Sequence, residues 1–212
     1  MLNNTLKIGF VIIVQFISGS IMYSYYLRKF AKAEFGGIGD GNPGVLNLWK
    51  RAGWKWGVTG MVLDYLKGIF PLLIFILTGF ISNRYAISAA ALAGIAGHAF
   101  SPFLKFKGGK SITTTFGAWT VISKWEGPVI FGSILGILYL YVKIRKKRST
   151  EAEDAIIVLF AFLGLLVYTF YNILKGNYAL MILYFGNVAI VLYKHSRELS
   201  GVSNIRFRRR NS

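Results

Sequence analysis

The chain has 212 residues, of which 54% are hydrophobic and 16% are charged, and its formal net charge is +17. This apolar fraction exceeds that of most soluble domains, so the composition predicts a single all-α integral membrane domain over residues 1–212. The sequence contains no cysteine, which excludes disulfides and thiolate chemistry. The basic residues fall in short blocks between apolar runs, so nucleic acid is not expected as a partner.

Seven apolar runs follow one another along the chain, at 8–26, 57–80, 86–100, 112–123, 128–142, 155–174 and 178–193. A helix needs about 20 residues to cross a bilayer, and roughly 17 is the usual lower limit. The third, fourth and fifth runs are short by this measure, which leaves open whether they are tilted, re-entrant or extended into their loops. The pattern predicts a polytopic protein with about seven transmembrane helices.

The basic residues alternate between the two sides of this arrangement. The first, third and fifth loops and the C-terminal tail hold twenty lysines and arginines, whereas the opposite side holds four. Because lysine and arginine are enriched in cytoplasmic loops, this distribution predicts an external N-terminus and a cytoplasmic C-terminus. Residues 201–212 are expected to form a basic, flexible tail. A cleaved signal peptide is the alternative interpretation of the first run, but it would remove a crossing that the alternation requires.

Two glycine-rich loops interrupt the apolar pattern, at 39–47 and 98–114. The first contains G-x-G-x-x-G but lies between two spans rather than in a βαβ unit, which argues against a dinucleotide fold. The second contains G-K-S at 109–111, which matches the end of a P-loop, but Leu104 occupies the position of the first P-loop glycine, so an ATPase is not indicated. Glycine lets backbone amides converge on an anion and lysine adds positive charge, so the two loops predict a cytoplasmic pocket for phosphate or a phosphate ester. Alternatively, the glycines only allow tight turns and the lysines only fix the topology.

Four motifs follow one another in a fixed order. They are S-G-S-I at 18–21 with Tyr25 and Leu27, G-D-G-N-P-G at 39–44 with Asn47, D-x-x-K-G at 64–68, and the long stretch from Gly97 to Thr114. Together they resemble the PlsY-type acyl-phosphate:glycerol-3-phosphate acyltransferases of bacterial membranes. The last stretch is the most specific, since it is similar to that family's G-H-x-F-P-x-F-x-x-F-x-G-G-K motif.

This resemblance implies a reaction and a setting. An acyl group would pass from acyl phosphate to the 1-hydroxyl of glycerol-3-phosphate, giving lysophosphatidic acid for phospholipid synthesis. The enzyme would lie in the bacterial cell membrane with its active site facing the cytoplasm and in contact with membrane lipid. A soluble enzyme that makes acyl phosphate from acyl carrier protein would supply the donor. Because phosphate is a good leaving group, the transfer needs positioning and charge neutralisation, and neither a metal nor a cofactor is expected.

The expected site residues come from both loops, the second span and the tail. The catalytic candidates are His98, Lys110 and Asn42. The expected phosphate-binding residues are Gly41, Asn47, Lys50, Arg51, Lys107, Gly108, Gly109, Thr114 and His195. Supporting roles are expected for Asp40, Asp64 and Lys67, the last two either as part of the site or as a structural ion pair three residues apart on one helix face. Glu151, Glu153 and Asp154 instead indicate a solvated helix start.

Several positions depart from the family's motifs. Asp40 stands where the family has serine, Lys50 stands where it has arginine, and Ser111-Ile112-Thr113 replaces G-V-A. In the tail, Ser196 and Glu198 replace an arginine and an asparagine after His195, and a rival alignment uses Asn204 instead. A carboxylate at position 40 would repel a bound phosphate unless it is protonated or paired. These changes leave open a paralogue with another acceptor, or a non-catalytic membrane adaptor or transport protein.

Overall fold

The computed structural model describes residues 3–32, 42–146 and 149–200. Throughout these ranges the regular structure is helical, which confirms the predicted all-α class. The helices are α1 (Asn4–Ser20), α2 (Tyr23–Phe30), α3 (Val45–Ala52), α4 (Trp54–Leu77), α5 (Arg84–Ala99), α6 (Ile112–Ser123), α7 (Glu126–Lys146), α8 (Glu151–Leu174) and α9 (Leu180–Lys194), with a 3-10 turn at Pro102–Leu104. Asp40, Gly41 and the predicted tail at 201–212 lie outside the described residues.

Each of the seven apolar runs contributes a helix, and the protein is a multi-pass membrane protein. In the described part of the chain, five helical segments are long and apolar enough to cross a bilayer: Asn4–Phe30, Trp54–Leu77, Arg84–Leu104, Glu126–Arg145 and Glu151–Leu174. The other two runs form α6 and α9, which have 12 and 15 residues. These two helices are about 18 and 22 Å long, compared with roughly 30 Å of hydrocarbon. The count of seven crossings and the orientation therefore stay predictions.

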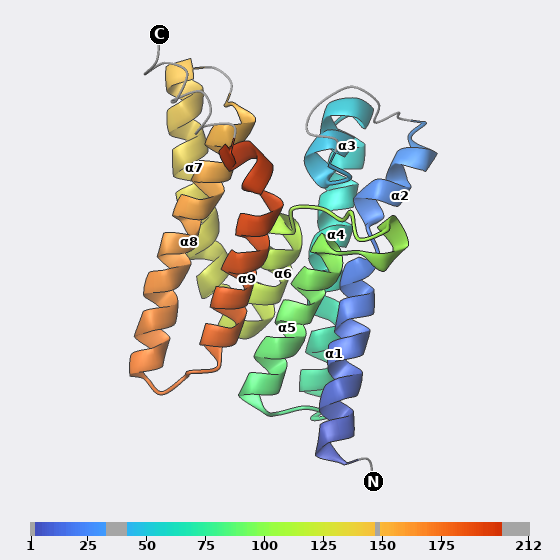
Figure 1. Cartoon of the computed structure of the whole chain (residues 1–212), viewed down its shortest axis with the longest axis vertical. Coiled ribbons are helices and arrows are strands. Elements are labelled where there is room, and N and C mark those ends of the chain that lie inside the picture. The colour runs from blue at the N-terminus through green and yellow to red at the C-terminus, as the bar shows by residue number, and fades with distance from the viewer. Residues whose placement is uncertain (1–2, 33–41, 147–148, 201–212) are drawn as a thin grey trace.

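The two ends of the helical bundle carry different parts of the chain (Figure 1). The half of the bundle toward one end holds α2, α3 and the C-terminal end of α9, and the loop between α5 and α6 lies below α2 and α3. The opposite end holds the start of α1 and the turns that join α4 to α5 and α8 to α9. The glycine-rich loop and the last residues of α9 thus share the end to which the sequence assigns most positive charge.

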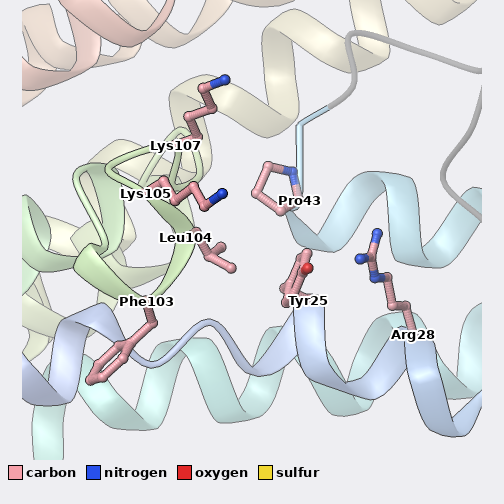
Figure 2. A pocket seen from close by; sticks show the side chains of 7 residues that line it. All are labelled: Tyr25, Arg28, Pro43, Phe103, Leu104, Lys105 and Lys107. Carbon is pink, nitrogen blue, oxygen red and sulfur yellow. The ribbon is translucent and has the colours of Figure 1, made fainter.

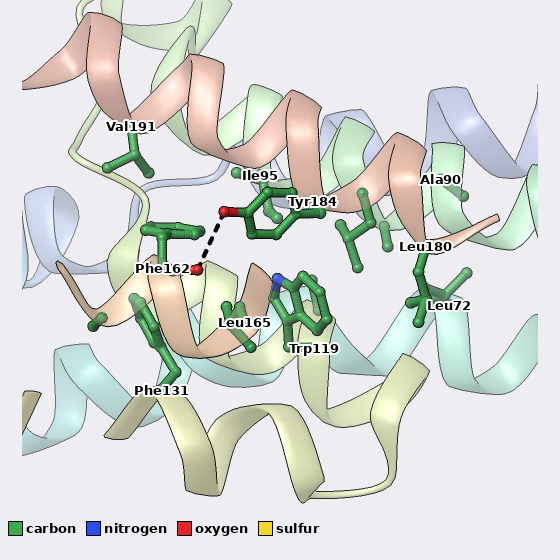
Figure 3. Close-up of a cluster of buried hydrophobic side chains, with 14 of the residues drawn as sticks. Leu72, Ala90, Ile95, Trp119, Phe131, Phe162, Leu165, Leu180, Tyr184 and Val191 are labelled. Atoms are coloured by element: carbon green, nitrogen blue, oxygen red, sulfur yellow. Dashed lines mark hydrogen bonds between the residues drawn. The ribbon is translucent and has the colours of Figure 1, made fainter. Parts of the chain in front are cut away.

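Aromatic side chains fill the bundle where α6, α7, α8 and α9 meet (Figure 3). Phe131 of α7 packs against Phe162 of α8 with ring centroids 4.9 Å apart, and Trp119 of α6 is 1% exposed. Tyr184 of α9 reaches the same cluster, and its hydroxyl donates to the carbonyl oxygen of Phe162 at 3.2 Å. This bond satisfies the one polar atom that the tyrosine brings into an apolar region.

Polar side chains also join helices across the bundle. In α1, Gln15 Nε2 donates to the main-chain oxygen of Gly68 in α4 at 3.3 Å. Thr115 of α6 donates to Asn187 Oδ1 of α9 at 3.1 Å. Such interhelical hydrogen bonds stabilise helix packing in a bilayer, where lipid tails are as apolar as the side chains. The first bond joins α1 to α4, and the second joins α6 to α9.

The acidic residues Glu151, Glu153 and Asp154 lie in the first turn of α8 and form a helix N-terminus, as the sequence indicates. Thr150 Oγ1 accepts from the Glu153 amide at 3.2 Å, and the Glu153 carboxylate accepts from the Thr150 amide at 3.0 Å. This reciprocal pair is a capping box, which satisfies two amides that the helix itself leaves without partners.

Candidate active site

The second glycine-rich loop is folded back on the end of α5. Gly109 N–H donates to the carbonyl oxygen of His98 at 3.0 Å, and Ser111 Oγ donates to the carbonyl oxygen of Ile95 at 3.1 Å. A Cβ atom at Gly108 would overlap the carbonyl oxygen of His98, so only glycine fits this approach. The loop is therefore held by backbone hydrogen bonds, and the Gly109 N–H donates to the His98 carbonyl oxygen.

Lys194, the last residue of α9, also supports this loop. Its Nζ donates to the carbonyl oxygens of Ala99 at 3.1 Å and Gly108 at 2.8 Å. The sequence analysis did not single out Lys194, because a lysine at the end of an apolar run is the ordinary signature of a membrane anchor. Its position at the end of the last apolar run, on the predicted side of the glycine-rich loop, was the available signal.

His98 lies at the C-terminal end of α5 and is 4% exposed. Its Nδ1 lies 3.0 Å from Thr114 Oγ1, and the same hydroxyl donates to the main-chain oxygen of Asp64 at 3.2 Å. On the other side of the ring, a Cβ atom at Gly109 would overlap Nε2. Thr114, expected among the phosphate-binding residues, is fully buried here and contacts His98 and α4.

Asp64 and Lys67 form a buried ion pair with 2.8 Å between Oδ1 and Nζ. Asp64 Oδ1 also accepts from the Tyr23 amide at 3.2 Å, and Lys67 Nζ donates to the carbonyl oxygen of Ile21 at 2.6 Å. These two backbone groups lie at the break between α1 and α2. The pair therefore compensates for the hydrogen bonds that the interrupted helix loses.

The residues that follow α9 return to the same loop. Lys110 Nζ lies 2.9 Å from Glu198 Oε1, with 21% and 9% of the two side chains exposed. Of the two alignments of the tail, the structure therefore brings Glu198 to Lys110, whereas Asn204 lies outside the described residues. His195 is 2% exposed and its Nδ1 lies 2.8 Å from the carbonyl oxygen of Val191.

The first loop is described from Asn42 onward. Asn47 Nδ2 donates to the main-chain oxygen of Asn42 at 2.8 Å, and Ser24 of α2 donates to the main-chain oxygen of Pro43 at 3.1 Å. Lys50 lies exposed in the last turn of α3. The two asparagines thus contact each other, and α2 holds the loop in place.

A cavity of about 290 Å³ lies between the two loops (Figure 2). In Figure 2, Lys105 and Leu104 point toward Pro43 and Tyr25, and Arg28 lies on the far side of Tyr25. The complete lining is Tyr25, Arg28, Pro43, Phe103, Leu104, Lys105 and Lys107. Of the expected phosphate-binding residues, Lys107 lines this cavity, and Arg28 and Lys105 are additions that the sequence analysis missed.

The lining joins two kinds of chemistry. Arg28, Lys105 and Lys107 supply positive charge, and Phe103, Leu104 and Tyr25 supply apolar surface. The guanidinium of Arg28 lies 4.0 Å from the centre of the Tyr25 ring, which orients it as a cation–π pair. In the described ranges, no group of three or more histidine or acidic side chains is placed to hold a metal ion.

Comparison with known proteins decides the family. Residues 9–204 match the family model described as glycerol-3-phosphate acyltransferase. The chain belongs to the glycerol-3-phosphate acyltransferase family. Its similarity to a curated member from Thermotoga maritima, named glycerol-3-phosphate acyltransferase 1, is 51% identity over 90% of this chain and 95% of the relative.

Solved structures of PlsY share the fold of this family member. PlsY is described as an integral membrane glycerol 3-phosphate acyltransferase. Its glycerol 3-phosphate form has a TM-score of 0.74 at 23% identity, and its lysophosphatidic acid form has a TM-score of 0.70 at 26% identity. Both alignments cover 94% of this chain and 93% of the solved chain. The resemblance inferred from the motifs is thus confirmed at the level of family and fold.

Proposed function

We propose that this chain transfers a fatty acyl group from acyl phosphate to the 1-hydroxyl of glycerol-3-phosphate and releases lysophosphatidic acid and phosphate. The observation that carries the proposal is the folded loop at 98–110. It places Lys107 in the cavity between the loops, and it holds His98 and Lys110 within the same short segment. Family membership supports the acyltransferase activity and does not favour an adaptor or a transporter.

The lining of the cavity suits an acyl phosphate. This donor has a phosphate head joined directly to an apolar chain, so a site for it requires cationic groups beside an apolar wall. Lys105, Lys107 and Arg28 supply the charge, whereas Leu104 and Phe103 supply apolar surface. Fixed cations neutralise the charge that develops on the departing phosphate, which lowers the barrier to transfer.

The reaction then needs few groups. The 1-hydroxyl oxygen attacks the acyl carbon, the bond from that carbon to the phosphate oxygen breaks, and phosphate leaves with the electron pair. Lys107 and Lys110 hold one phosphate, while Asn42 and Asn47 with Lys50 or Arg51 hold the other. His98 orients the attacking hydroxyl or takes its proton, a step that the substrate phosphate can share.

The remaining candidates have supporting roles. Gly108 and Gly109 keep the loop close to His98, and His195 lies at the end of α9 beside the segment that reaches Lys110. Asp64 and Lys67 hold the α1–α2 break. Asp40 and Gly41 belong to the first loop outside the described residues, and we propose that Gly41 contacts phosphate there and that Asp40 affects the choice of acceptor.

We also propose a location and a supplier. The charge asymmetry favours a bacterial cell membrane protein whose active site faces the cytoplasm, where glycerol-3-phosphate is dissolved. A soluble enzyme that converts acyl carrier protein thioesters to acyl phosphate would deliver the donor from the same side. Membrane lipid surrounds the helices and receives the product.

A donor and acceptor panel tests this function. Purified protein in detergent is given palmitoyl phosphate or palmitoyl-CoA as donor, and glycerol-3-phosphate or glycerol as acceptor. We expect product from only one of the four pairs: palmitoyl phosphate with glycerol-3-phosphate should give lysophosphatidic acid. Product only with another acceptor would mean that the chain is a divergent paralogue with a different substrate. If folded protein gives no product from any pair, acyl transfer is contradicted.

A further inference from the structure

A second cavity, the α7–α8 groove, lies apart from the cavity between the two loops. It has a volume of about 240 Å³ and is lined by seven residues of α7 and α8. The apolar part of this lining consists of Leu138, Tyr141, Val142, Ile156, Ile157 and Phe160. Both helices belong to segments that are long and apolar enough to cross a bilayer, so the groove lies on the part of the chain that lipid surrounds.

The α7–α8 groove is open on one side. Ile157 is 5% exposed, whereas Tyr141 and Phe160 are 57% and 55% exposed. In a membrane-spanning segment, the molecules that reach such an open apolar surface are lipids, whose tails are as apolar as the side chains. A lipid chain that lies in the groove packs against the apolar atoms of its lining. The groove therefore suits a hydrocarbon chain.

Positive charge lies at the end of α7, next to this groove. The guanidinium of Arg145 lies 5.6 Å from the centre of the Tyr141 ring. Residues four and seven apart share a helix face, so Arg145 lies on the face of α7 that carries Tyr141 and Leu138. Lys143 is also exposed, but two residues from Tyr141 it lies on the opposite face. Basic residues directly after a membrane-spanning segment bind anionic lipid headgroups, and Arg145 is the one placed beside the groove.

The seventh lining residue is acidic. Glu153 Oε2 accepts from the amide of Thr150 at 3.0 Å and from its hydroxyl at 3.2 Å. Glu153 also lies in the first turn of α8, where the helix dipole stabilises negative charge. Residues 143–154 contain five basic and three acidic residues. This excess of positive charge favours an anionic headgroup over a zwitterionic one.

We propose that the α7–α8 groove binds one acyl chain of an anionic phospholipid of the surrounding bilayer, and that Arg145 binds its phosphate. A phospholipid carries its charged phosphate at the membrane surface and its chains in the hydrocarbon. The hairpin of α7 and α8 offers the matching groups in the same order, with a cation at the end of the span and an apolar groove within it. The proposal does not depend on the proposed acyl transfer.

Fluorescence quenching measures which lipid occupies the groove. The chain has no cysteine, so a bimane label on Ile137→Cys reports on a single place, one turn before Tyr141. The labelled protein is placed in phosphatidylcholine vesicles with increasing fractions of brominated phosphatidylglycerol, brominated phosphatidylcholine or brominated lysophosphatidic acid. Val167→Cys provides the control position, because residue 167 is 70% exposed and lies on the face of α8 that carries Phe160, two turns away.

A basic side chain near the membrane surface favours an anionic lipid by about fivefold. At position 137 we therefore expect phosphatidylglycerol to bind about fivefold more strongly than phosphatidylcholine, and at position 167 we expect nearly equal binding. Arg145→Gln should abolish the preference at position 137, whereas Lys143→Gln, the matched change on the opposite face, should keep it. Ile156→Trp should also weaken the preference, because the larger side chain fills the groove.

Four results would overturn the proposal. Equal binding of the two phospholipids at position 137 would mean that the groove does not select an anionic lipid. Equal losses in Arg145→Gln and Lys143→Gln would mean that the charge of the whole segment attracts lipid without a specific site. An unchanged preference in Ile156→Trp would mean that the chain lies outside the groove. Stronger binding of lysophosphatidic acid than of phosphatidylglycerol would assign the groove to that lipid instead.

Discussion

Glu198 and Lys110 form an ion pair, with 2.9 Å between Glu198 Oε1 and Lys110 Nζ. The second carboxylate oxygen of Glu198, Oε2, is buried and has no hydrogen-bond partner within the described part of the chain. A substrate phosphate that binds Lys110 must therefore share the lysine with a carboxylate of the same sign or displace it. In the alignment that begins at His195, Glu198 stands where the family motif has a neutral asparagine, and in that alignment this competition would distinguish the chain from the family pattern.

Replacing Glu198 with glutamine should strengthen binding of glycerol-3-phosphate. The substitution keeps the size of the side chain and removes the competing charge. Because a partly exposed ion pair contributes about 1 kcal/mol or less, we expect KM to fall by about two- to fivefold. Steady-state kinetics at fixed palmitoyl phosphate measure this, with Glu151→Gln at the exposed start of α8 as the matched control. A higher KM in Glu198→Gln would show that Glu198 instead orients Lys110 for the substrate.

Replacing Lys194 with methionine should loosen the glycine-rich loop. Methionine keeps most of the apolar stem but removes the two hydrogen bonds to Ala99 and Gly108. Hydrogen bonds from charged donors stabilise by about 1.5–3 kcal/mol, so we expect activity to fall about 10-fold or more. Hydrogen exchange across residues 99–109 should quicken in this variant and not in Lys175→Met at the opposite end of the molecule. Unchanged exchange in Lys194→Met would contradict the bracing role.

The Asp64–Lys67 pair should tolerate double replacement better than single replacement. Asp64→Asn or Lys67→Met leaves one buried charge without its partner, which costs about 3–5 kcal/mol. The double variant removes both charges, so its loss should be smaller than the sum of the single losses. Unfolding by denaturant in detergent measures all four proteins. Additive losses would mean that the two side chains do not act as a pair.

Gly109→Ala should abolish transfer without unfolding the protein. Its added Cβ would overlap His98 Nε2 and push the ring away from the loop. Gly136→Ala is the control, because a Cβ atom at that position in α7 meets nothing within 4 Å. We expect activity to fall by roughly 100-fold in Gly109→Ala because the ring of His98 is displaced from the loop, while the protein stays folded with a lower melting temperature, since such overpacking costs about 1–3 kcal/mol. Full activity in Gly109→Ala would contradict a site that needs the close approach of His98 and the glycine-rich loop.

Hydropathy predicts the helices well because it depends on local composition. The fifth run was expected at 128–142, but α7 extends to Lys146 since charged residues can continue a helix beyond the hydrocarbon. The first run was expected to be continuous over 8–26, but the helix breaks at Ile21 and Met22. The backbone groups at that break are satisfied by Asp64 and Lys67. Periodicity cannot reveal such a contact, because its partners lie more than 40 residues apart.

The motif pattern predicted candidate site residues but not their contacts. His98, Lys110 and Thr114 were all expected, and the structure links the first and third through one hydroxyl. Lys194 and Glu198 approach the same loop from the end of α9, and only the three-dimensional arrangement shows this. Tertiary packing decides which side chains meet, so their order in the sequence is insufficient.

Acyl transfer by matched lysine variants tests the central claim most directly. Purified wild type, Lys110→Ala and Lys175→Ala are given palmitoyl phosphate and radiolabelled glycerol-3-phosphate, and labelled lysophosphatidic acid is counted. We predict product from wild type and Lys175→Ala, and a loss of roughly 100-fold in Lys110→Ala, as for other fixed groups that stabilise developing charge. Equal product from all three proteins, or none from folded wild type, would contradict the claim that the loop at 98–110 carries out acyl transfer to glycerol-3-phosphate.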